Sequence, residues 1–217
     1  MMRAISIAWQ QIRPIFLVLL GATILSAWYR KWLLTVLVGG IWLWSCTFFR
    51  DPDRTPDDND PNLILSPADG RVQKIEIVNE PRFFCGEARR ITIFLSIFDV
   101  HVQRSPYAGQ VVYLQHRLGS FAPAFSHRAD DNESNFLGLR TDRGPLAIDQ
   151  LAGAIARRII CHRQIGDQLQ LGERYGLIKF GSRVDLHLPL DVGIVIREGQ
   201  RVSGGKTPVA RWPDTND

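Results

Sequence analysis

The chain has 217 residues, enough for one domain of ordinary size and a small addition to it. Hydrophobic residues make up 45% and charged residues 22%, which excludes a chain that is disordered throughout. The formal charge is +4, and only four of the 26 basic residues are Lys, so an anionic partner suits the Arg-rich composition. The Arg residues are scattered without an aromatic and basic cluster, and nucleic acid is not expected as that partner.

Two apolar runs open the chain, Ile15 to Tyr29 and Trp32 to Phe49, and Arg30 and Lys31 separate them. As helices they would be about 22 Å and 27 Å long, and aromatic residues at the ends of the runs suit a lipid interface. Residues 1–49 are therefore predicted to form a membrane-associated helical hairpin that spans the bilayer or dips into one leaflet. A cleaved signal peptide fits poorly because a second apolar run follows at once. A hairpin buried in a core is the other alternative.

Residues 50–62 are rich in proline and carboxylates, which excludes a helix and predicts an extended linker. Residues 63–217 are predicted to form a separate catalytic domain.

Short β-branched or alternating runs between turn signals recur through this domain, and no long segment has a helical period. Strands are predicted at 71–78, 90–97, 110–116, 177–180, 184–188 and 192–196, and residues 146–161 are expected to form strands or a short helix. The fold class is predicted to be mainly β, an antiparallel β sandwich or barrel with barrel-sandwich-like turns, preceded by the helical hairpin.

The three cysteines, Cys46, Cys85 and Cys161, are far apart and have no CxxC or Cys/His ligand spacing. A disulfide framework is not expected, no metal ligand cluster is visible, and a reducing compartment fits best.

Three polar residues suit a nucleophile, a base and a group that orients the base: Ser182, His101 and Asp69. Taken singly, each has a structural explanation, because Gly-Ser and Asp-Gly pairs are usual in turns and a lone His is often structural. Since all three lie at turns or strand ends, a β fold is expected to bring them to one end of the domain.

Several segments are similar to one family over most of the chain: FFRDPDR, SPADGRV, IFDVHVQRSPYAGQV, LAGAIARRIIC, GERYGLIKFGSRVDLHLP and GQRVSGGKTPVA. They resemble the shorter class of phosphatidylserine decarboxylase proenzymes, from about Phe48 to Ala210. Two departures are visible. Ser134 stands where the family usually has Arg, and Arg104 stands where the longer class has a second His, which would then come from elsewhere, such as His127.

The resemblance implies autocatalytic cleavage between Gly181 and Ser182, which gives a β chain of residues 1–181 and an α chain of residues 182–217. Ser182 would become a covalent pyruvoyl group, with no metal needed. This group would decarboxylate phosphatidylserine to phosphatidylethanolamine through a Schiff base. His101, oriented by Asp69, is expected to be the catalytic base.

The same resemblance implies further residues and partners. Substrate binding is expected from Arg104, Asn132 and Glu133. The expected partners are phosphatidylserine, the bilayer, the two chains of one precursor and a second copy in a homo-oligomer. The expected location is the cell membrane, with the catalytic domain on the cytoplasmic face.

Two other functions stay open at this point. One is a pyruvoyl-dependent decarboxylase of a soluble amino acid, against which the apolar hairpin argues. The other is a membrane-tethered carrier or binding module, because some turns resemble those of biotinyl and lipoyl domains; a modifiable Lys at a hairpin tip is missing for this.

Overall fold

The computed structural model describes residues 3–58, 60–119, 132–153, 159–178 and 182–214, with the backbone alone for residues 3–12. The chain divides into two compact units, Met1–Pro52 and Asp53–Asp217.

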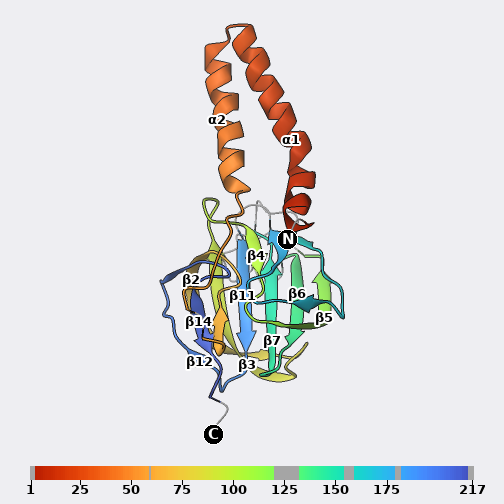
Figure 1. The fold of residues 1–217 in the computed structure, drawn as a ribbon, viewed down its shortest axis with the longest axis vertical. Helices are drawn as coiled ribbons and strands as arrows, with labels where there is room; N and C mark the ends of the chain where they lie inside the picture. Colours follow the sequence, from red (N-terminus) through yellow and green to blue (C-terminus); the bar gives the residue numbers. More distant parts are fainter. Residues whose placement is uncertain (1–2, 59, 120–131, 154–158, 179–181, 215–217) are drawn as a thin grey trace. The chain divides into compact units, whose positions relative to one another are not determined.

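The first unit consists of two helices, α1 (Arg3–Trp28) and α2 (Trp32–Phe48), which run antiparallel (Figure 1). Arg30 has a φ of 53°, and this left-handed residue helps to reverse the chain between them. The hydroxyls of Ser26 and Thr35 lie 3.0 Å apart and link the two helices. The two predicted helices are thus present. Neither helix, over the residues described, combines the length and apolar character needed to cross a membrane.

The second unit is built from β-strands, as predicted. Their bounds are β1 (Leu63–Leu65), β2 (Gly70–Glu80), β3 (Gly86–Leu95), β4 (Val102–Arg104), β5 (Gly109–Arg117), β6 (Ser134–Arg140), β7 (Pro145–Leu151), β8 (Ile159–Cys161), β9 (Gln168–Leu169), β10 (Arg174–Ile178), β11 (Ser182–Leu188), β12 (Gly193–Ile194), β13 (Arg201–Val202) and β14 (Pro208–Arg211).

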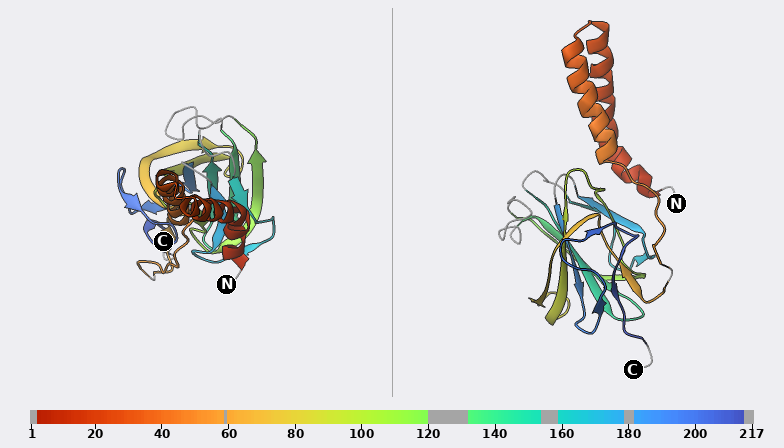
Figure 2. Two further views of the ribbon diagram at one scale, coloured as in Figure 1. Left: turned by 90° about the horizontal axis from the view of Figure 1, so that it is seen from above. Right: turned by 90° about the vertical axis from the view of Figure 1, so that its left-hand side faces the viewer.

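One large sheet carries the architecture, with the strand order β13-β2-β3-β11-β7-β6-β5-β9. Two three-stranded sheets, β1-β14-β12 and β4-β10-β8, complete the domain, and every pairing described is antiparallel. The large sheet is strongly curled (Figure 2). The prediction of a mainly β, antiparallel fold is confirmed, and the arrangement is a curled half-barrel with no pairing described between β13 and β9.

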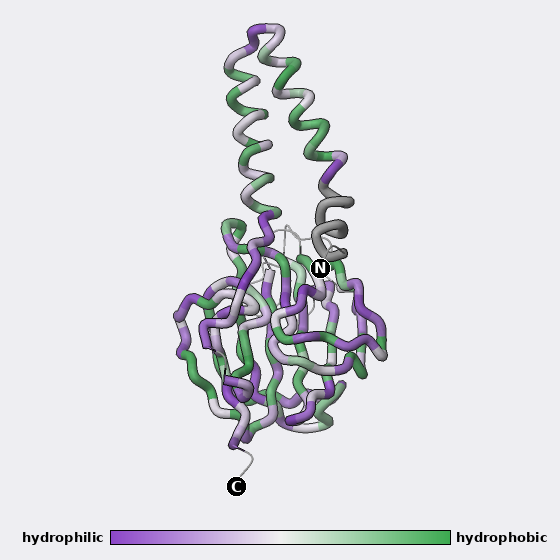
Figure 3. The backbone as a smooth tube through the Cα atoms, in the orientation of Figure 1, coloured by the Kyte–Doolittle hydropathy of each residue, from purple (hydrophilic) through white to green (hydrophobic). Residues whose placement is uncertain are grey.

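Alternation along the strands explains where the core lies. Val184, Leu186 and Leu188 of β11 belong to the buried cluster, together with Ile91 and Ile148 of the neighbouring strands. Residues between them point to the other face of the sheet, as the two-residue period of a strand requires. Hydrophobic and hydrophilic residues therefore alternate along the backbone of the domain (Figure 3).

The described residues between Asp53 and Asn62 form no helix, and they are held to the β domain at several points. Arg54 binds Asp69, the Asp57 N–H donates to the Lys206 carbonyl, and the Tyr107 hydroxyl donates to the Pro61 carbonyl at 2.8 Å. This part of the predicted linker therefore belongs to the domain surface.

Candidate active site

Three neighbouring strands place the predicted catalytic residues at one end of the large sheet. β2 begins at Gly70, β3 ends at Leu95 and β11 begins at Ser182, which pairs with Leu95. Gly70 has a φ of 150°, and a Cβ there would lie 2.1 Å from the Phe94 carbonyl oxygen, so only glycine fits this close approach. Asp69 and Ser182 therefore enter the sheet at the same end, on either side of β3.

Ser182 is completely buried, and its Oγ has no hydrogen-bond partner among the residues described. A buried hydroxyl without a partner is costly and uncommon, so it marks a site that needs a chemical explanation. The sequence predicted a turn here. Ser182 is instead the first residue of β11, and Gly181, the predicted cleavage position, lies outside the described residues.

His101 lies just beyond the end of β3, after a tight turn that Asp99 stabilises. The Asp99 carboxylate accepts hydrogen bonds from the N–H and the hydroxyl of Ser96, at 2.8 and 2.7 Å. His101 Nδ1 lies 2.8 Å from the Asp99 carbonyl oxygen. Because a carbonyl oxygen only accepts, Nδ1 carries the proton, and Nε2 of the neutral ring is the atom that takes up a proton.

The main chain of His101 is tied to the strand that precedes the predicted cleavage position. Its carbonyl oxygen accepts a hydrogen bond from the N–H of Ile178, the last residue of β10, at 3.3 Å. Val102 pairs with Leu177 in the same ladder. His101 is thus held beside the chain that leads, after three residues outside the described range, to Ser182.

A chain of three buried amide side chains also ends at His101. Asn135 donates to Gln150 at 2.9 Å, Gln150 donates to Gln103 at 3.0 Å, and Gln103 donates to the His101 carbonyl at 2.8 Å. Gln103 and Gln150 are completely buried. A Cβ on Gly176 would lie 2.8 Å from the Gln150 amide nitrogen, so this glycine leaves room for the chain.

Asp69 was predicted to orient His101, and the contacts described for its carboxylate are with Arg54 and Gly204. Arg54 binds its two oxygens at 2.5 and 2.7 Å, and the Gly204 N–H donates to Oδ1 at 2.9 Å. The turn that carries Asp69 is also joined to the segment after His101, because the Arg104 N–H donates to the Pro67 carbonyl. The orienting role of Asp69 stays a prediction.

The residues predicted to bind substrate are all buried and have structural contacts. Arg104 donates to the Gly172 carbonyl at 3.3 Å. Asn132 donates to the Ala152 carbonyl at 2.7 Å, and Glu133 lies 3.0 Å from His116 Nε2. Ala152 follows β7 next to the start of β11, so Asn132 lies near Ser182, whereas Glu133 faces His116. Their binding roles stay predictions.

Two further predictions concern groups beyond these residues. His127, the suggested source of a second imidazole, lies outside the described residues. In the described part of the chain, no three His, Cys, Asp or Glu side chains are grouped as in a metal site.

Sequence reasoning missed the Asp99 carbonyl and the amides of Gln103, Gln150 and Asn135. A main-chain acceptor leaves no signal in a sequence. Gln103 and Gln150 leave little signal either, because each stands beside a charged residue of its strand, Arg104 in β4 and Asp149 in β7.

Comparison with known proteins shows the family of this chain. The family model described as phosphatidylserine decarboxylase matches residues 43–210. The chain is 43% identical to the phosphatidylserine decarboxylase proenzyme of Symbiobacterium thermophilum, over 89% of this chain and 91% of that protein. It is 44% identical to the proenzyme of the same name from Carboxydothermus hydrogenoformans, over 90% and 92% of the two chains. The chain therefore belongs to the phosphatidylserine decarboxylase family.

Proposed function

We propose that this protein is a proenzyme that cuts itself before Ser182 and then decarboxylates phosphatidylserine to phosphatidylethanolamine. The observation that carries the proposal is the Ser182 hydroxyl, which is completely buried and has no hydrogen-bond partner among the described residues. Relatives similar over nine-tenths of the chain are named as proenzymes of this activity, which supports the same reaction here.

The cleavage would use the Ser182 hydroxyl as the nucleophile. Its Oγ adds to the Gly181 carbonyl carbon, the peptide C–N bond breaks, and the Gly181 acyl group is left on Oγ as an ester. Loss of the proton from Cα of residue 182 then expels the Gly181 carboxylate and leaves a carbon–carbon double bond. Addition of water and loss of ammonia convert this end into a keto group.

An unactivated hydroxyl is a weak nucleophile, so a base must take its proton. Nε2 of His101 suits this task because the Asp99 carbonyl holds the proton on Nδ1. The bonds from Ile178 and Gln103 to the His101 carbonyl fix its main chain beside the cleavage segment. These contacts support His101 as the group that moves the proton.

The buried end of β11 fits a pyruvoyl group made from Ser182, because the site is shielded from water and the hydroxyl has no structural bond to lose. When present, this group would supply a ketone that takes up the substrate amine and withdraws electrons from the carbon bearing the carboxylate. His101 would hold the proton that returns to that carbon, at Nε2.

Mass spectrometry of the purified protein tests the cleavage. The wild type should give two chains, residues 1–181 and a shorter chain with a blocked N-terminus, whereas Ser182→Ala should remain a single chain. Activity should be assayed on phosphatidylserine and, in parallel, on free serine and aspartate. A wild type that stays intact and active would exclude the mechanism, and turnover of the free amino acids alone would indicate a soluble substrate.

We further propose that the two helices hold the protein at the cell membrane. Large apolar side chains are exposed along both helices, among them Val18, Trp28, Leu33 and Val36, which are 69%, 82%, 80% and 72% exposed. An apolar surface of this kind favours lipid. It also suits a diacyl substrate, since withdrawing acyl chains from a bilayer costs about 0.8 kcal/mol per CH₂.

Deletion of residues 1–49 tests this role. The shortened protein should still cut itself, but it should lose turnover of phosphatidylserine in liposomes while keeping turnover of the same lipid in detergent. Equal activity of both proteins on liposomes would contradict the proposal.

The free state of Cys46, Cys85 and Cys161 supports a β domain on the cytoplasmic, reducing side. Cys85 is exposed, so a membrane-impermeant maleimide should label it only after intact cells are opened. Labelling in intact cells would place the domain outside.

A further inference from the structure

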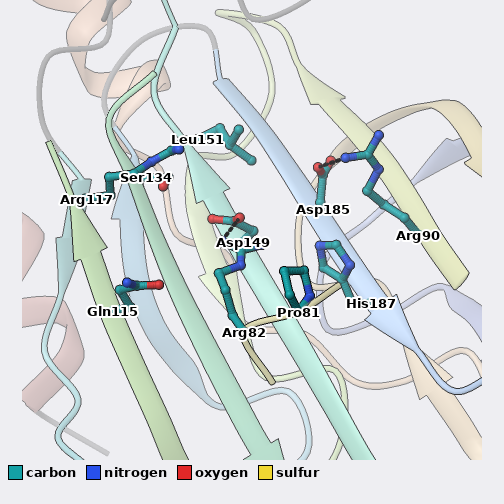
Figure 4. Close-up of a pocket in the computed structure, with 10 residues that line it drawn as sticks. All are labelled: Pro81, Arg82, Arg90, Gln115, Arg117, Ser134, Asp149, Leu151, Asp185 and His187. Atoms are coloured by element: carbon teal, nitrogen blue, oxygen red, sulfur yellow. Dashed lines mark hydrogen bonds and ion pairs between the residues drawn. The ribbon is translucent and has the colours of Figure 1, made fainter. Parts of the chain in front are cut away.

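A polar pocket of about 460 Å³ lies on the outer face of the large sheet (Figure 4). On β11, Asp185 and His187 line it, whereas Val184 and Leu186 belong to the core on the opposite face. Ser182 shares the face of Val184 by the two-residue period of the strand. The pocket is therefore separate from the candidate active site.

The loop between β2 and β3 supplies one wall of the pocket. Glu80 accepts hydrogen bonds from the N–H groups of Phe83 and Phe84, which folds the loop over the sheet. The loop places the Arg82 guanidinium 3.8 Å from the centre of the Phe136 ring. Arg82 also donates to Asp149 Oδ2 at 2.9 Å. The loop is thus fixed with one guanidinium over the centre of the sheet.

Several buried polar atoms at this pocket have no hydrogen-bond partner among the residues described: both ring nitrogens of His187, Oδ1 of Asp149 and Nε of Arg90. His187 is 3% exposed and Asp149 is 6% exposed, so solvent does not reach these atoms freely. Unpaired buried donors and acceptors are rare in native proteins and often mark the place of a ligand or an ordered water. Here they gather at a single pocket.

The charges of the lining restrict the ligand. Arg82, Arg90 and Arg117 supply positive charge, which suits an oxoanion. Arg82 and Arg90 also pair with Glu80 and Glu76, and Nε of Arg90 is left without a partner among the described residues. Asp185 is already held by Arg183, with bonds of 2.8 and 2.5 Å. Oδ1 of Asp149 has no hydrogen-bond partner among the described residues. An anion without a hydrogen-bond donor would leave this oxygen unpaired and would be repelled by its charge. The ligand must therefore bring a hydrogen-bond donor together with its negative charge.

Hydrogen phosphate meets both conditions, because it keeps one P–OH group at neutral pH beside its charged oxygens. Sulfate, a phosphodiester and a fully ionised phosphomonoester have no such proton. Burial raises the pKa of Asp149 to about 6, with Arg82 opposing the rise and Asp185 adding to it, so this carboxylate is ionised at pH 7.5. Burial also lowers the pKa of His187 to about 4, and its neutral ring offers one donor and one acceptor.

We propose that the outer-face pocket binds hydrogen phosphate, with the guanidinium groups of Arg82 and Arg90 on its charged oxygens and Asp149 Oδ1 accepting its proton. Bound phosphate would complete the hydrogen bonds of the buried atoms and stabilise the folded sheet.

Titration calorimetry of the full chain at pH 7.5, in chloride buffer of constant ionic strength, tests this inference. Orthophosphate should bind with a stoichiometry of one and raise the melting temperature. Sulfate and dimethyl phosphate, which have no hydrogen-bond donor, should bind about 30-fold more weakly, because a proton must first be placed between them and Asp149, about 1.5 pH units above its pKa. Dimethyl phosphate has the phosphodiester of a lipid headgroup, so it also separates free phosphate from a headgroup phosphate as the source of the ligand.

Two variants and a control sharpen the result. Asp149→Asn should lose the preference for phosphate over sulfate, because an amide also donates, and Arg90→Gln should weaken both anions about tenfold or more. Arg211→Gln removes an equal charge from a 46% exposed side chain elsewhere and should change nothing. Near-ultraviolet circular dichroism checks that each variant is folded. Absence of saturable phosphate binding, equal affinity for sulfate, or tighter binding of dimethyl phosphate would overturn the proposal.

Discussion

Arg54 and Asp69 form a two-point ion pair, with the guanidinium nitrogens 2.5 and 2.7 Å from the carboxylate oxygens. Arg54 belongs to the segment that follows the helices, and Asp69 immediately precedes β2 at the candidate active site. Both side chains are largely buried, at 10% and 13% exposure. The pair therefore fixes the start of the β domain to the sheet end where Ser182 begins β11.

Removing this pair should affect both stability and cleavage. Arg54→Leu leaves a buried carboxylate without its counter-ion, so we expect a loss of about 2 kcal/mol in the free energy of unfolding. Unfolding in urea should be measured in the uncut Ser182→Ala background, where the chain is continuous. The cleavage rate, measured with Ser182 intact, should also fall. Lys206→Gln breaks the more exposed pair with Asp57 and should cost less than about 1 kcal/mol. Equal losses in the two variants would contradict this reading.

Gln103 offers a test of how His101 is positioned. Gln103→Leu keeps the size of the side chain but removes the bond to the His101 carbonyl, so the imidazole should shift and the precursor should cut itself about tenfold more slowly. Gel analysis of freshly made precursor over time gives the rate. Gln110→Leu, at a partly exposed position of β5, is the matched control. An unchanged rate in Gln103→Leu would show that Ile178 alone holds the carbonyl.

The stability of the domain should depend on pH through two buried groups, His187 and Asp149, whose pKa values are shifted in opposite directions. Burial lowers the pKa of His187 from 6.5 to about 4, so between these two pH values the ring is protonated mainly in the unfolded chain. The free energy of unfolding therefore falls as the pH drops from 6.5 to 4. Burial raises the pKa of Asp149 from 3.8 to about 6, so the folded chain binds the extra proton, and stability rises as the pH drops from 6 to 4. Each effect is worth about 3 kcal/mol at most.

Because the two effects nearly cancel in the wild type, single variants should reveal them. His187→Asn should gain about 2 kcal/mol relative to its parent when the pH is lowered from 6.5 to 4.5, and Asp149→Asn should lose a similar amount. Urea unfolding of uncut protein at the two pH values provides the measurement. Parallel pH profiles of the two variants would refute the assignment of opposite shifts.

Gly70 should tolerate no side chain. Gly70→Ala would press a methyl group against the Phe94 carbonyl and strain a φ of 150°, so we expect a loss of more than about 3 kcal/mol or no soluble protein. Gly86→Ala, also in the β2–β3 hairpin but with its nearest neighbour at 4.0 Å, should be nearly neutral. Thermal unfolding of both variants measures the two losses of stability, and equal losses would contradict the prediction.

The sequence predicted β2 and β11 from alternating apolar residues and β3 from an apolar run, because apolar side chains of these strands form the buried core. It missed β6, which begins with the polar residues Ser134 and Asn135; in the structure Asn135 is buried and bonded to Gln150. Local patterns do not show which polar residues find partners across a sheet.

For the site, the sequence predicted Ser182, His101 and Asp69 as catalytic residues, and the fold places all three near one sheet end. The partners of these residues were beyond sequence reasoning. Asp99 acts on His101 through its main chain, which every residue possesses. Arg54 reaches Asp69 from a segment that looked like a free linker, because its proline and acidic composition indicates only the absence of a helix.

The position of β11 in the middle of the large sheet has a consequence for the severed protein. β11 is hydrogen-bonded on one side to β3 and on the other to β7, while β13 pairs with β2 and β14 with β1. A break in front of Ser182 would thus release no peptide. The short fragment would stay interlocked with the long one as a permanent two-chain molecule, which migrates as one species on a native gel and as two bands only in denaturant.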